Sequence, residues 1–365
     1  MCMIKILHSG DWHLDSPFQG RTEVQAGALR QELLQIPDKI AALCREENCD
    51  LVLLSGDLFD GAYTQETFRR VSDALQRMEK PVFISPGNHD YLSPDSPYEK
   101  EVWPENVHIF RENHMTAVEL PAWDLVLYGA AFTRQEQPEG FLSGFSVPED
   151  GRTHIAVLHG EIDPADRRYG PVRKDEIAAS GLDYLALGHI HKRMEPQSYG
   201  KTLCAWPGCI EGRGFDELGE KGFYEGTIED GRVSVIFVPF ARRRYEILEV
   251  NVTGKDPRAA IETALPGETA QHLYRILLTG ETGEAGVSAS ALQEALADRF
   301  YALDIRDHTR MAEDVWARAE EDSLRGLFLR ELRAKWDAAA TEEERKTVTQ
   351  AAQFGLAALD HRDLE

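Results

Sequence analysis

Long apolar runs are absent from the sequence. No uninterrupted apolar stretch approaches the roughly 20 residues that a membrane-spanning helix needs. The opening residues, MCMIKILHSG, turn polar too soon for a signal peptide. We therefore expect a cytoplasmic protein without a membrane partner. The sequence also lacks internal repeats and low-complexity tracts, and its 42% of hydrophobic residues argues against a disordered chain.

Cysteine is scarce and irregularly spaced. The five cysteines are Cys2, Cys44, Cys49, Cys204 and Cys209, and no two of them form a CxxC pair. This spacing fits reduced thiols in a reducing compartment and argues against a structural zinc site on sulfur. Because no motif for nucleophilic chemistry lies near Cys209, we expect that residue to be structural.

Positive charge is also in short supply. Lysine and arginine number 40 against 63 aspartate and glutamate residues, so the formal net charge is −23. Non-specific binding to nucleic acid depends mainly on contacts from lysine and arginine to phosphates, so this balance argues against broad wrapping of DNA. Any chemistry on phosphate groups must then depend on metal ions or on local basic patches.

Short apolar runs alternate with helical patterns in the first part of the chain. The runs are IKILHS, DLVLLS, PVFIS, LVLYGAA, HIAVLH and DYLALG, and a polar loop follows each of them. Stretches 25–47 and 65–79 carry a helical pattern. This succession predicts an α/β domain over residues 1–240 that presents polar groups at its strand ends, where open α/β sheets bind ligands.

The pattern changes after a predicted β-hairpin, FYEGTIEDGRVSVIFVPF, which has EDG at its turn. Residues 243–306 alternate strand and helix, which predicts a small βαβαβ domain over 241–310. From about Ala312 onward the pattern is helical, and we expect a C-terminal helical arm over 311–365. A chain of 365 residues suits two domains and an arm.

Five of the expected strands end in side chains that commonly bind metal ions. The five strand-end motifs are GDWH with Asp11 and His13, GDLFD with Asp57 and Asp60, GNHD with Asn88, His89 and Asp90, LHGE with His159, and GHIH with His189 and His191. Each motif alone is more typical of a turn or a helix cap than of a ligand. Their joint occurrence favours one shared site. The two histidines of GHIH can serve it together, because alternate residues of an extended segment point to the same face.

The residue types indicate the chemistry of that site. Two divalent cations about 3.5–4 Å apart can share one carboxylate, hold a hydroxide between them and clamp a phosphoryl group during in-line displacement. Imidazole, carboxylate and amide ligands without thiolate suit Mn, Fe or Zn better than Ca or Mg. We expect two divalent metal ions, with Mn as the first choice, Fe, Zn or Mg as alternatives, and Asp57 as the bridging ligand.

The five motifs resemble those of the calcineurin-like metallophosphoesterases, and specifically of the SbcD-like DNA repair nucleases with their YhaO-like relatives. ILHSGDWHLDSPF, LLSGDLFD, SPGNHD, LHGE and LALGHIH match the family motifs in order. WPGCIEGRGFDELGEKGF, residues 206–223, resembles a segment of the SbcD-like group, and PFARRRYEILEVNV resembles the lead into its capping domain. The resemblance covers roughly residues 1–306 and implies a β-sandwich flanked by helices, in the order α/β/β/α.

The resemblance also implies a role for each motif residue. Asp11, His13, Asp57 and His191 would hold one metal, and Asp57, Asn88, His159 and His189 would hold the other. His89 would be catalytic: it would contact the phosphate and help to protonate the leaving oxygen, with Asp60 accepting its other N–H and fixing its tautomer. Some relatives have histidine where this chain has Asp60.

Several polar residues near the motifs have a structural interpretation. Asp90 is expected to cap its loop, and His8, inside a strand, to be a core residue with satisfied hydrogen bonds. The basic residues that flank the last two motifs are Arg167, Arg168, Arg173, Lys174, Lys192 and Arg193. Together they could supply a local positive surface, although each alone is more often a solvated charge.

The C-terminal arm carries an apolar stripe. Leu324, Phe328, Leu332 and Trp336 follow one another at i, i+4 spacing. In the SbcD-like family the segment after the capping domain binds the coiled-coil base of a partner ATPase, and an amphipathic helix laid into a groove would do this. We therefore expect a docking arm. The alternative is that the stripe packs on the core of the chain itself.

The resemblance implies a Mn-dependent DNA phosphodiesterase that acts in DNA repair with an SMC-like or AAA-type ATPase, with homodimer formation left open. A phosphodiesterase or phosphatase for small nucleotides would need the same metals, and is the first alternative. A largely regulatory subunit of an ATPase complex is the second, but a degenerate site should lack ligands, and here all seven positions are filled. Exonuclease or endonuclease action, and strand polarity, stay open.

Overall fold

The computed structural model describes residues 3–18, 22–282, 286–311 and 315–359 of the chain. Two compact units can be distinguished. One comprises residues 1–247, 268–275 and 297–303, and the other comprises residues 248–267, 276–296 and 304–365.

The first unit contains a six-stranded sheet in the order β14-β13-β1-β2-β3-β4. Its strands are β1 (Ile4–Ser9), β2 (Leu51–Leu54), β3 (Val82–Ile84), β4 (Val107–Ile109), β13 (Gly222–Glu229) and β14 (Arg232–Pro239). Neighbouring strands from β1 to β4 are parallel, whereas β13 and β14 form the predicted hairpin. Asp230 and Gly231 at its turn have φ of 49° and 73°, the left-handed backbone that a tight hairpin turn requires.

A second six-stranded sheet has the order β11-β12-β10-β7-β6-β5. Its strands are β5 (Thr116–Leu120), β6 (Leu125–Gly129), β7 (Thr153–His159), β10 (Tyr184–Gly188), β11 (Met194–Tyr199) and β12 (Thr202–Trp206). The four central strands β6, β7, β10 and β12 are parallel, and antiparallel strands close both edges. Parallel strands point their carboxyl ends to one edge, so each sheet gathers its strand-end loops on one side.

The two sheets share a buried core. Leu51 and Leu53 of β2 belong to this core, together with Leu127 of β6. The alternate residues Val52 and Leu54 belong instead to a core shared with the helices on the outer face of the first sheet. This period of two arises because successive side chains of a strand point to opposite faces.

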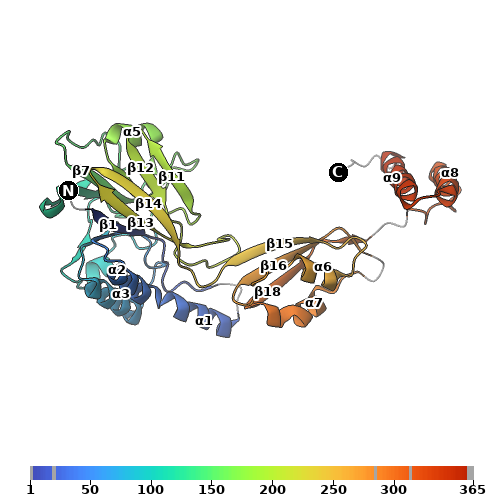
Figure 1. The fold of residues 1–365 in the computed structure, drawn as a ribbon, viewed down its shortest axis with the longest axis horizontal. Coiled ribbons are helices and arrows are strands. Elements are labelled where there is room, and N and C mark those ends of the chain that lie inside the picture. The colour runs from blue at the N-terminus through green and yellow to red at the C-terminus, as the bar shows by residue number, and fades with distance from the viewer. Residues whose placement is uncertain (1–2, 19–21, 283–285, 312–314, 360–365) are drawn as a thin grey trace. The chain divides into compact units, whose positions relative to one another are not determined.

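Helices cover the outer faces of both sheets, as Figure 1 shows. They are α1 (Glu23–Leu33), α2 (Ile36–Glu46) and α3 (Gln65–Met78) on the first sheet, and α5 (Lys174–Ser180) on the second. Ile177 of α5, for example, packs with Leu158 and Leu185 of the second sheet. The predicted α/β/β/α sandwich is therefore confirmed.

The stretch 25–47 is two helices rather than one. α1 ends at Leu33, and α2 begins at Ile36 with Pro37 in its first turn. Proline lacks a backbone N–H and is tolerated only at the start of a helix, so a single helix through this position is unfavourable. The other predicted helix agrees closely, since α3 begins at Gln65 and ends at Met78.

The segment after the hairpin contains the predicted succession of strand and helix. It consists of β15 (Tyr245–Asn251), α6 (Pro257–Ala264), β16 (Leu273–Thr279), α7 (Ala289–Leu296) and β18 (Ala302–Asp307). The three strands form one sheet in the order β15-β16-β18. The short elements of the chain are α4 (Pro97–Lys100), β8 (Glu161–Ile162), β9 (Pro171–Val172), β17 (Glu281–Thr282), β19 (Arg310–Met311), and the 3₁₀ turns Pro121–Trp123 and Ala297–Arg299.

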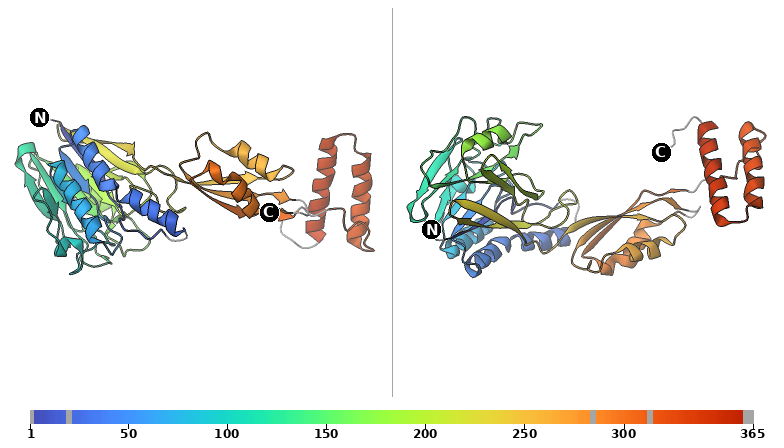
Figure 2. Two further views of the ribbon diagram at one scale, coloured as in Figure 1. Left: turned by 90° about the horizontal axis from the view of Figure 1, so that it is seen from below. Right: turned by 45° about the horizontal axis from the view of Figure 1, so that its top comes forward.

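The C-terminal segment forms a pair of helices with a core of its own. α8 (Leu324–Ala338) and α9 (Glu342–Leu359) lie side by side, as Figure 2 shows. Phe328 and Leu332 of the apolar stripe pack against the buried residues of this pair, whereas Leu324 is 69% exposed. Part of the stripe thus packs on the chain itself, and its docking role stays a prediction. Among the described residues, no helix is both long and apolar enough to cross a membrane.

Candidate metal centre

The five strand-end motifs meet at one place in the structure. They follow β1, β2, β3, β7 and β10, which are parallel strands of the two sheets. The loops after β1 and β2 remain paired beyond the strands, because the N–H groups of Asp11 and His13 donate to the carbonyls of Gly56 and Asp57, both at 2.9 Å. All seven predicted ligands are brought together: Asp11, His13, Asp57, Asn88, His159, His189 and His191.

Backbone strain marks the same residues. Asp11, His13, Asp57 and His189 have φ of 51°, 46°, 51° and 93°, in the left-handed region that favours glycine. Such conformations are uncommon for other residues, cost about 1–3 kcal/mol each, and tend to cluster at functional sites. Four of the seven predicted ligands thus adopt a backbone conformation that residues of functional sites often adopt.

Glycine allows the loops to approach one another. Gly56 has a φ of 89°, and a side chain there would collide with the ring of His159. A side chain at Gly188 would overlap the carbonyl oxygen of Ser55, which belongs to the other sheet's motif. The absence of side chains at these two positions therefore lets the two sheets bring their motifs into contact.

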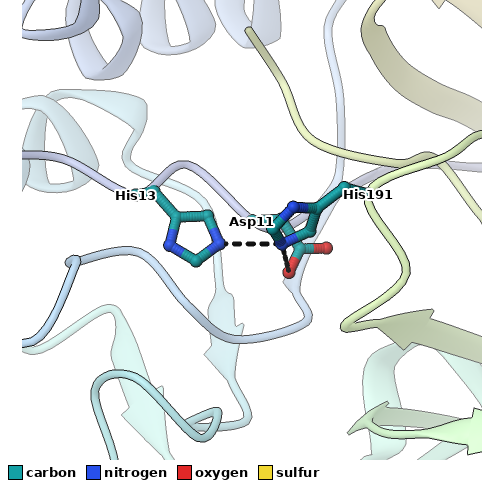
Figure 3. A group of neighbouring side chains, drawn as sticks. All are labelled: Asp11, His13 and His191. Atoms are coloured by element: carbon teal, nitrogen blue, oxygen red, sulfur yellow. Dashed lines mark hydrogen bonds and ion pairs between the residues drawn. The ribbon is translucent and has the colours of Figure 1, made fainter. Parts of the chain in front are cut away.

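The first group of ligands is Asp11, His13 and His191, drawn in Figure 3. The Nε2 atoms of His13 and His191 lie 3.0 Å apart, although they come from motifs 178 residues apart in the sequence. Oδ1 of Asp11 is 3.8 Å from Nε2 of His191, and Oδ2 of Asp57 is 3.7 Å from Nε2 of His13. Two imidazoles and two carboxylates thus converge on one point.

The second group lies on the other side of Asp57. Nε2 of His159 is 2.9 Å from Oδ1 of Asn88 and 3.4 Å from Oδ2 of Asp57. Nδ1 of His189 is 3.1 Å from the same oxygen of Asn88. Because Oδ2 of Asp57 faces a histidine of each group, this carboxylate occupies the position that a bridging ligand would need.

The tautomers of the histidines fit bound cations. Nδ1 of His159 lies 2.8 Å from the carbonyl oxygen of Ser55, which can only accept, so this nitrogen is the donor. Nδ1 of His13 and Nδ1 of His191 face the carboxylates of Asp60 and Glu217 at 3.2 and 2.7 Å. When these rings are neutral, the proton is on Nδ1 and the lone pair is on Nε2. That lone pair points at the lone pairs of neighbouring nitrogen or oxygen atoms. A divalent cation satisfies such a convergence, so the residues present fit a metal.

Protons compete with cations for these ligands. Burial opposes a positive charge on His159, but the adjacent Asp57 carboxylate raises the pKa of His159 to about 9. Burial and the neighbouring His159 lower the pKa of His189 to about 3. Metal binding at the second group must therefore displace a proton from His159, whereas the lowered pKa keeps the ring of His189 neutral.

His89 and Asp60 lie beside the first group. Nδ1 of His89 is 3.0 Å from Oδ1 of Asp60, and this hydrogen bond raises the pKa of His89 above its ordinary value. The His89 side chain is 45% exposed, whereas that of His13 is fully buried. His89 also lines a cavity of about 520 Å³ that Tyr63, Tyr91 and other residues complete. This position suits a group that meets the substrate.

Geometry alone leaves His89 a second role. Ligand atoms of His13, Asp57 and His89 also lie within 4.8 Å of one another, so His89 could itself bind a metal. The prediction that His89 is catalytic rather than a ligand therefore stays a prediction, and so do the individual ligand roles.

Two structural interpretations are confirmed. The Asp90 carboxylate accepts hydrogen bonds from the N–H groups of Leu58 and Gly87, at 2.7 and 2.8 Å, and from Tyr98. It thereby ties the loop after β3 to the loop that carries Asp57. His8 is fully buried and contacts Tyr184 and Ser55, and burial lowers its pKa to about 3, which keeps it neutral.

Glu217 and Arg213 lie at the site but were not singled out from the sequence. Glu217 is 5% exposed and contacts both His191 and Arg213. Both residues belong to the segment 206–223, which links β12 to β13. An arginine and a glutamate four residues apart in that segment were the available signal.

The basic residues that flank the last motifs are largely neutralised. Arg168, Arg173, Lys174 and Arg193 pair with the acidic residues Asp166, Asp175, Asp163 and Glu195. Arg167 and Lys192 are exposed. The solvated-charge interpretation therefore holds for most of the group, and the local positive surface is weaker than the sequence suggests. Cys209 is fully buried, as its structural interpretation requires.

Comparisons with known proteins point to one family. The calcineurin-like phosphoesterase family matches residues 4–193. The uncharacterized metallophosphoesterase YhaO of Bacillus subtilis (strain 168) is 30% identical over 259 residues, which cover 67% of this chain and 61% of the relative. The alignment thus spans less than two thirds of that relative's length.

Similar solved structures are distant. TT1561 of Thermus thermophilus has a TM-score of 0.39 and 13% identity, covering 65% of this chain and 99% of its own. GAP50, the anchor in the inner membrane complex of Plasmodium, has a TM-score of 0.41 and 14% identity, with coverage of 66% and 85%. The family match, in contrast, spans more than half of the chain and includes all five motifs, so the chain belongs to the calcineurin-like phosphoesterases, which hydrolyse phosphoesters at a dinuclear metal site.

Proposed function

We propose that the chain is an SbcD-like, metal-dependent phosphodiesterase that cleaves DNA. The observation that carries the proposal is the convergence of two ligand groups on Asp57, with the more exposed His89 beside them. A site of this kind can act on a phosphoester that reaches His89 from the adjacent cavity. DNA as the substrate is supported by the likeness of residues 206–223 and of the segment after the hairpin to SbcD-like nucleases.

Two divalent cations would clamp the phosphoryl oxygens and supply a nucleophile from water at neutral pH. The chain's own residues supply the rest. The Asp60 carboxylate holds the Nδ1 proton of His89, so the protonated ring keeps its Nε2 proton for the leaving sugar oxygen. Asn88 faces His159 and His189 with its amide oxygen, and the buried Asp57 and Asp11 provide the negative charge that cations require.

Small nucleotides are a second candidate substrate. The pairing of Arg168, Arg173, Lys174 and Arg193 with acidic neighbours leaves little positive surface for a long polyanion. The cavity of about 520 Å³ beside His89 has room for a nucleoside. These two observations favour a compact substrate, whereas the sequence resemblance favours DNA.

The proposal includes a partner ATPase of the SMC-like or AAA type and a role in DNA repair in the cytoplasm. Exposed apolar residues on α8 and α9 support a docking surface, since Leu324, Leu327 and Phe354 are 69%, 52% and 57% exposed. A groove on a coiled coil could bury such residues. Homodimer formation stays open.

Removal of metal is expected to abolish activity. Protein stripped with a chelator should hydrolyse no phosphoester, because the buried imidazoles and carboxylates have no cation to hold. Mn should restore activity best, and Ca should not restore it, because imidazole-rich sites favour transition metals over Ca. Calorimetric titration of the stripped protein should find two sites per chain. Saturation at one site, or full activity in excess chelator, would contradict the dinuclear assignment.

Substrate class can be tested with Mn-loaded protein and two kinds of substrate. End-labelled single- and double-stranded DNA should be shortened or cut, and bis(4-nitrophenyl) phosphate should be hydrolysed more slowly. The Asp57→Ala protein, prepared identically, controls for contaminating nucleases. Hydrolysis of the chromogenic diester and of small cyclic or linear nucleotides, with intact DNA, would instead select the second candidate.

A further inference from the structure

We propose that Glu217 and Arg213 form one positioning unit that orients the histidines on the Asp11 side of the metal centre. This inference rests on the proposed role of His191 and His13 as ligands of one metal. It assigns a function to the segment 206–223, which links β12 to β13 and contributes no predicted ligand.

Glu217 contacts Nδ1 of His191, the ring nitrogen that does not face His13. Its Oε1 lies 2.7 Å from Nδ1 of His191, and the carboxylate is 5% exposed. A histidine that donates one ring N–H to a carboxylate presents the other nitrogen to a metal in a fixed direction and with raised basicity. Glu217 therefore aims Nε2 of His191 at Asp11 and His13.

Arg213 holds Glu217 in turn. Its backbone N–H donates to Oε2 of Glu217 at 2.7 Å, and its NH2 group donates to Oε1 at 2.8 Å. Arg213 thus occupies both carboxylate oxygens, and the carboxylate it fixes in turn fixes the ring of His191. Burial opposes ionisation of Glu217, but the hydrogen bonds from His191 and Arg213 hold its pKa well below the ordinary range.

The same guanidinium reaches the other orienting carboxylate. Nη1 of Arg213 lies 3.8 Å from Oδ2 of Asp60. Oδ1 of Asp60 in turn faces Nδ1 of His13 at 3.2 Å and Nδ1 of His89 at 3.0 Å. The guanidinium of Arg213 therefore lies between the carboxylates of Glu217 and Asp60. Together these two carboxylates orient the rings of His191, His13 and His89. Without the Arg213 guanidinium, each of these partly buried carboxylates would lose a positively charged partner.

The backbone of His191 is held by the same segment. Its carbonyl accepts a hydrogen bond from Nζ of Lys221 at 3.0 Å and from the N–H of Cys209 at 3.1 Å. Lys221 is 3% exposed, which is rare for a lysine and requires such a partner. Both the ring and the main chain of His191 are thus positioned by residues 206–223.

The test is metal binding by the full-length chain carrying Glu217→Gln, titrated with Mn after chelator treatment. The amide oxygen of a glutamine can accept a hydrogen bond from His191 or from Arg213. Its NH₂ group then faces the remaining N–H donor, for which Glu217 provides a second acceptor oxygen. We expect one of the two sites to bind Mn about 10–100-fold more weakly. The other site should keep wild-type affinity, because Asn88, His159 and His189 make no contact with Glu217 among the described residues.

The matched control is Glu211→Gln in the same segment. Glu211 accepts hydrogen bonds from the N–H groups of Arg242 and Arg243, and burial raises its pKa to about 7. A glutamine at this position also turns its NH₂ group toward one of the two backbone donors, so the variant carries the same kind of local cost as Glu217→Gln. Because Glu211 does not orient His191 in this scheme, both Mn sites should bind as in the wild type. A general loosening of the segment would weaken both variants alike.

A second variant protects the test against misfolding. Arg213→Lys keeps the charge but loses the planar fork, so it should also weaken one Mn site selectively. Two full-affinity sites in both Glu217→Gln and Arg213→Lys would overturn the positioning role. Equal weakening of both sites, or a Glu211→Gln protein that behaves like Glu217→Gln, would overturn it too. A wild-type chain that binds fewer than two Mn ions would instead refute the proposed metal centre itself.

Discussion

Replacement of Asp57 with alanine is expected to abolish phosphoester hydrolysis and to empty the metal centre. Oδ2 of Asp57 faces His13 of one group and His159 of the other, so the variant loses the ligand that both cations would share. Because a metal contributes several kcal/mol of transition-state stabilisation, the rate should fall by at least about 10³-fold. Metal content after desalting, together with the rate on a chromogenic diester, measures both effects.

Folding must be checked alongside this variant. Asp57 is 1% exposed, and its N–H and that of Leu58 are held by Asp90. Melting curves recorded in chelator compare the two proteins without metal, and a cooperative transition in both shows that the loop has not collapsed. An Asp57→Ala protein that still carries two metals would refute the bridging role.

Replacement of His89 with alanine should reduce activity without loss of metal. Both metals should stay bound, and the rate should fall by roughly 10²–10⁴-fold, the usual contribution of a positioned general acid. The loss should be greatest for DNA, whose sugar oxygen needs a proton to leave, and smaller for a 4-nitrophenyl ester, whose leaving group is already stable as an anion. Parallel rates on the two substrates measure this difference.

The pH profile gives an independent reading of His89. A general acid must be protonated, and the bond to Asp60 raises the pKa of His89, so activity should persist below that raised pKa and fall as the pH rises through it. The alanine variant should lack this alkaline limb on DNA. Loss of one metal from the variant would show that His89 is a ligand, as its distance to His13 and Asp57 also allows.

The strand-end motifs were predictable from the sequence because two simple patterns coincide there. The run LVLL within DLVLLS is apolar throughout, since the strand is covered on both faces, and β2 begins at Leu51 and ends at Leu54 as the run does. Parallel strands then bring their following loops to one edge. Asp11 and Asp57 could therefore be placed together without knowledge of any distance.

Other features depend on packing that no short pattern records. Glu217 lies in an irregular segment, 26 residues from His191 in sequence, and its burial depends on how residues 206–223 pack against the loop that carries His191. The spacing of the apolar residues on α8 would be the same whether a partner or α9 covered them. The structure separates its members, with Phe328 packed and Leu324 exposed, because the position of α9 decides which face is covered.

The separation of the predicted ligands along the chain would link metal supply to the lifetime of the protein. His13 and His191 are 178 residues apart, so the unfolded chain has no preformed centre and cations would bind essentially the folded state alone. A cation at 100 times its dissociation constant then adds about 2.7 kcal/mol to the free energy of unfolding. Cells starved of the metal would hold a less stable form of the same chain, with a larger unfolded population open to proteases.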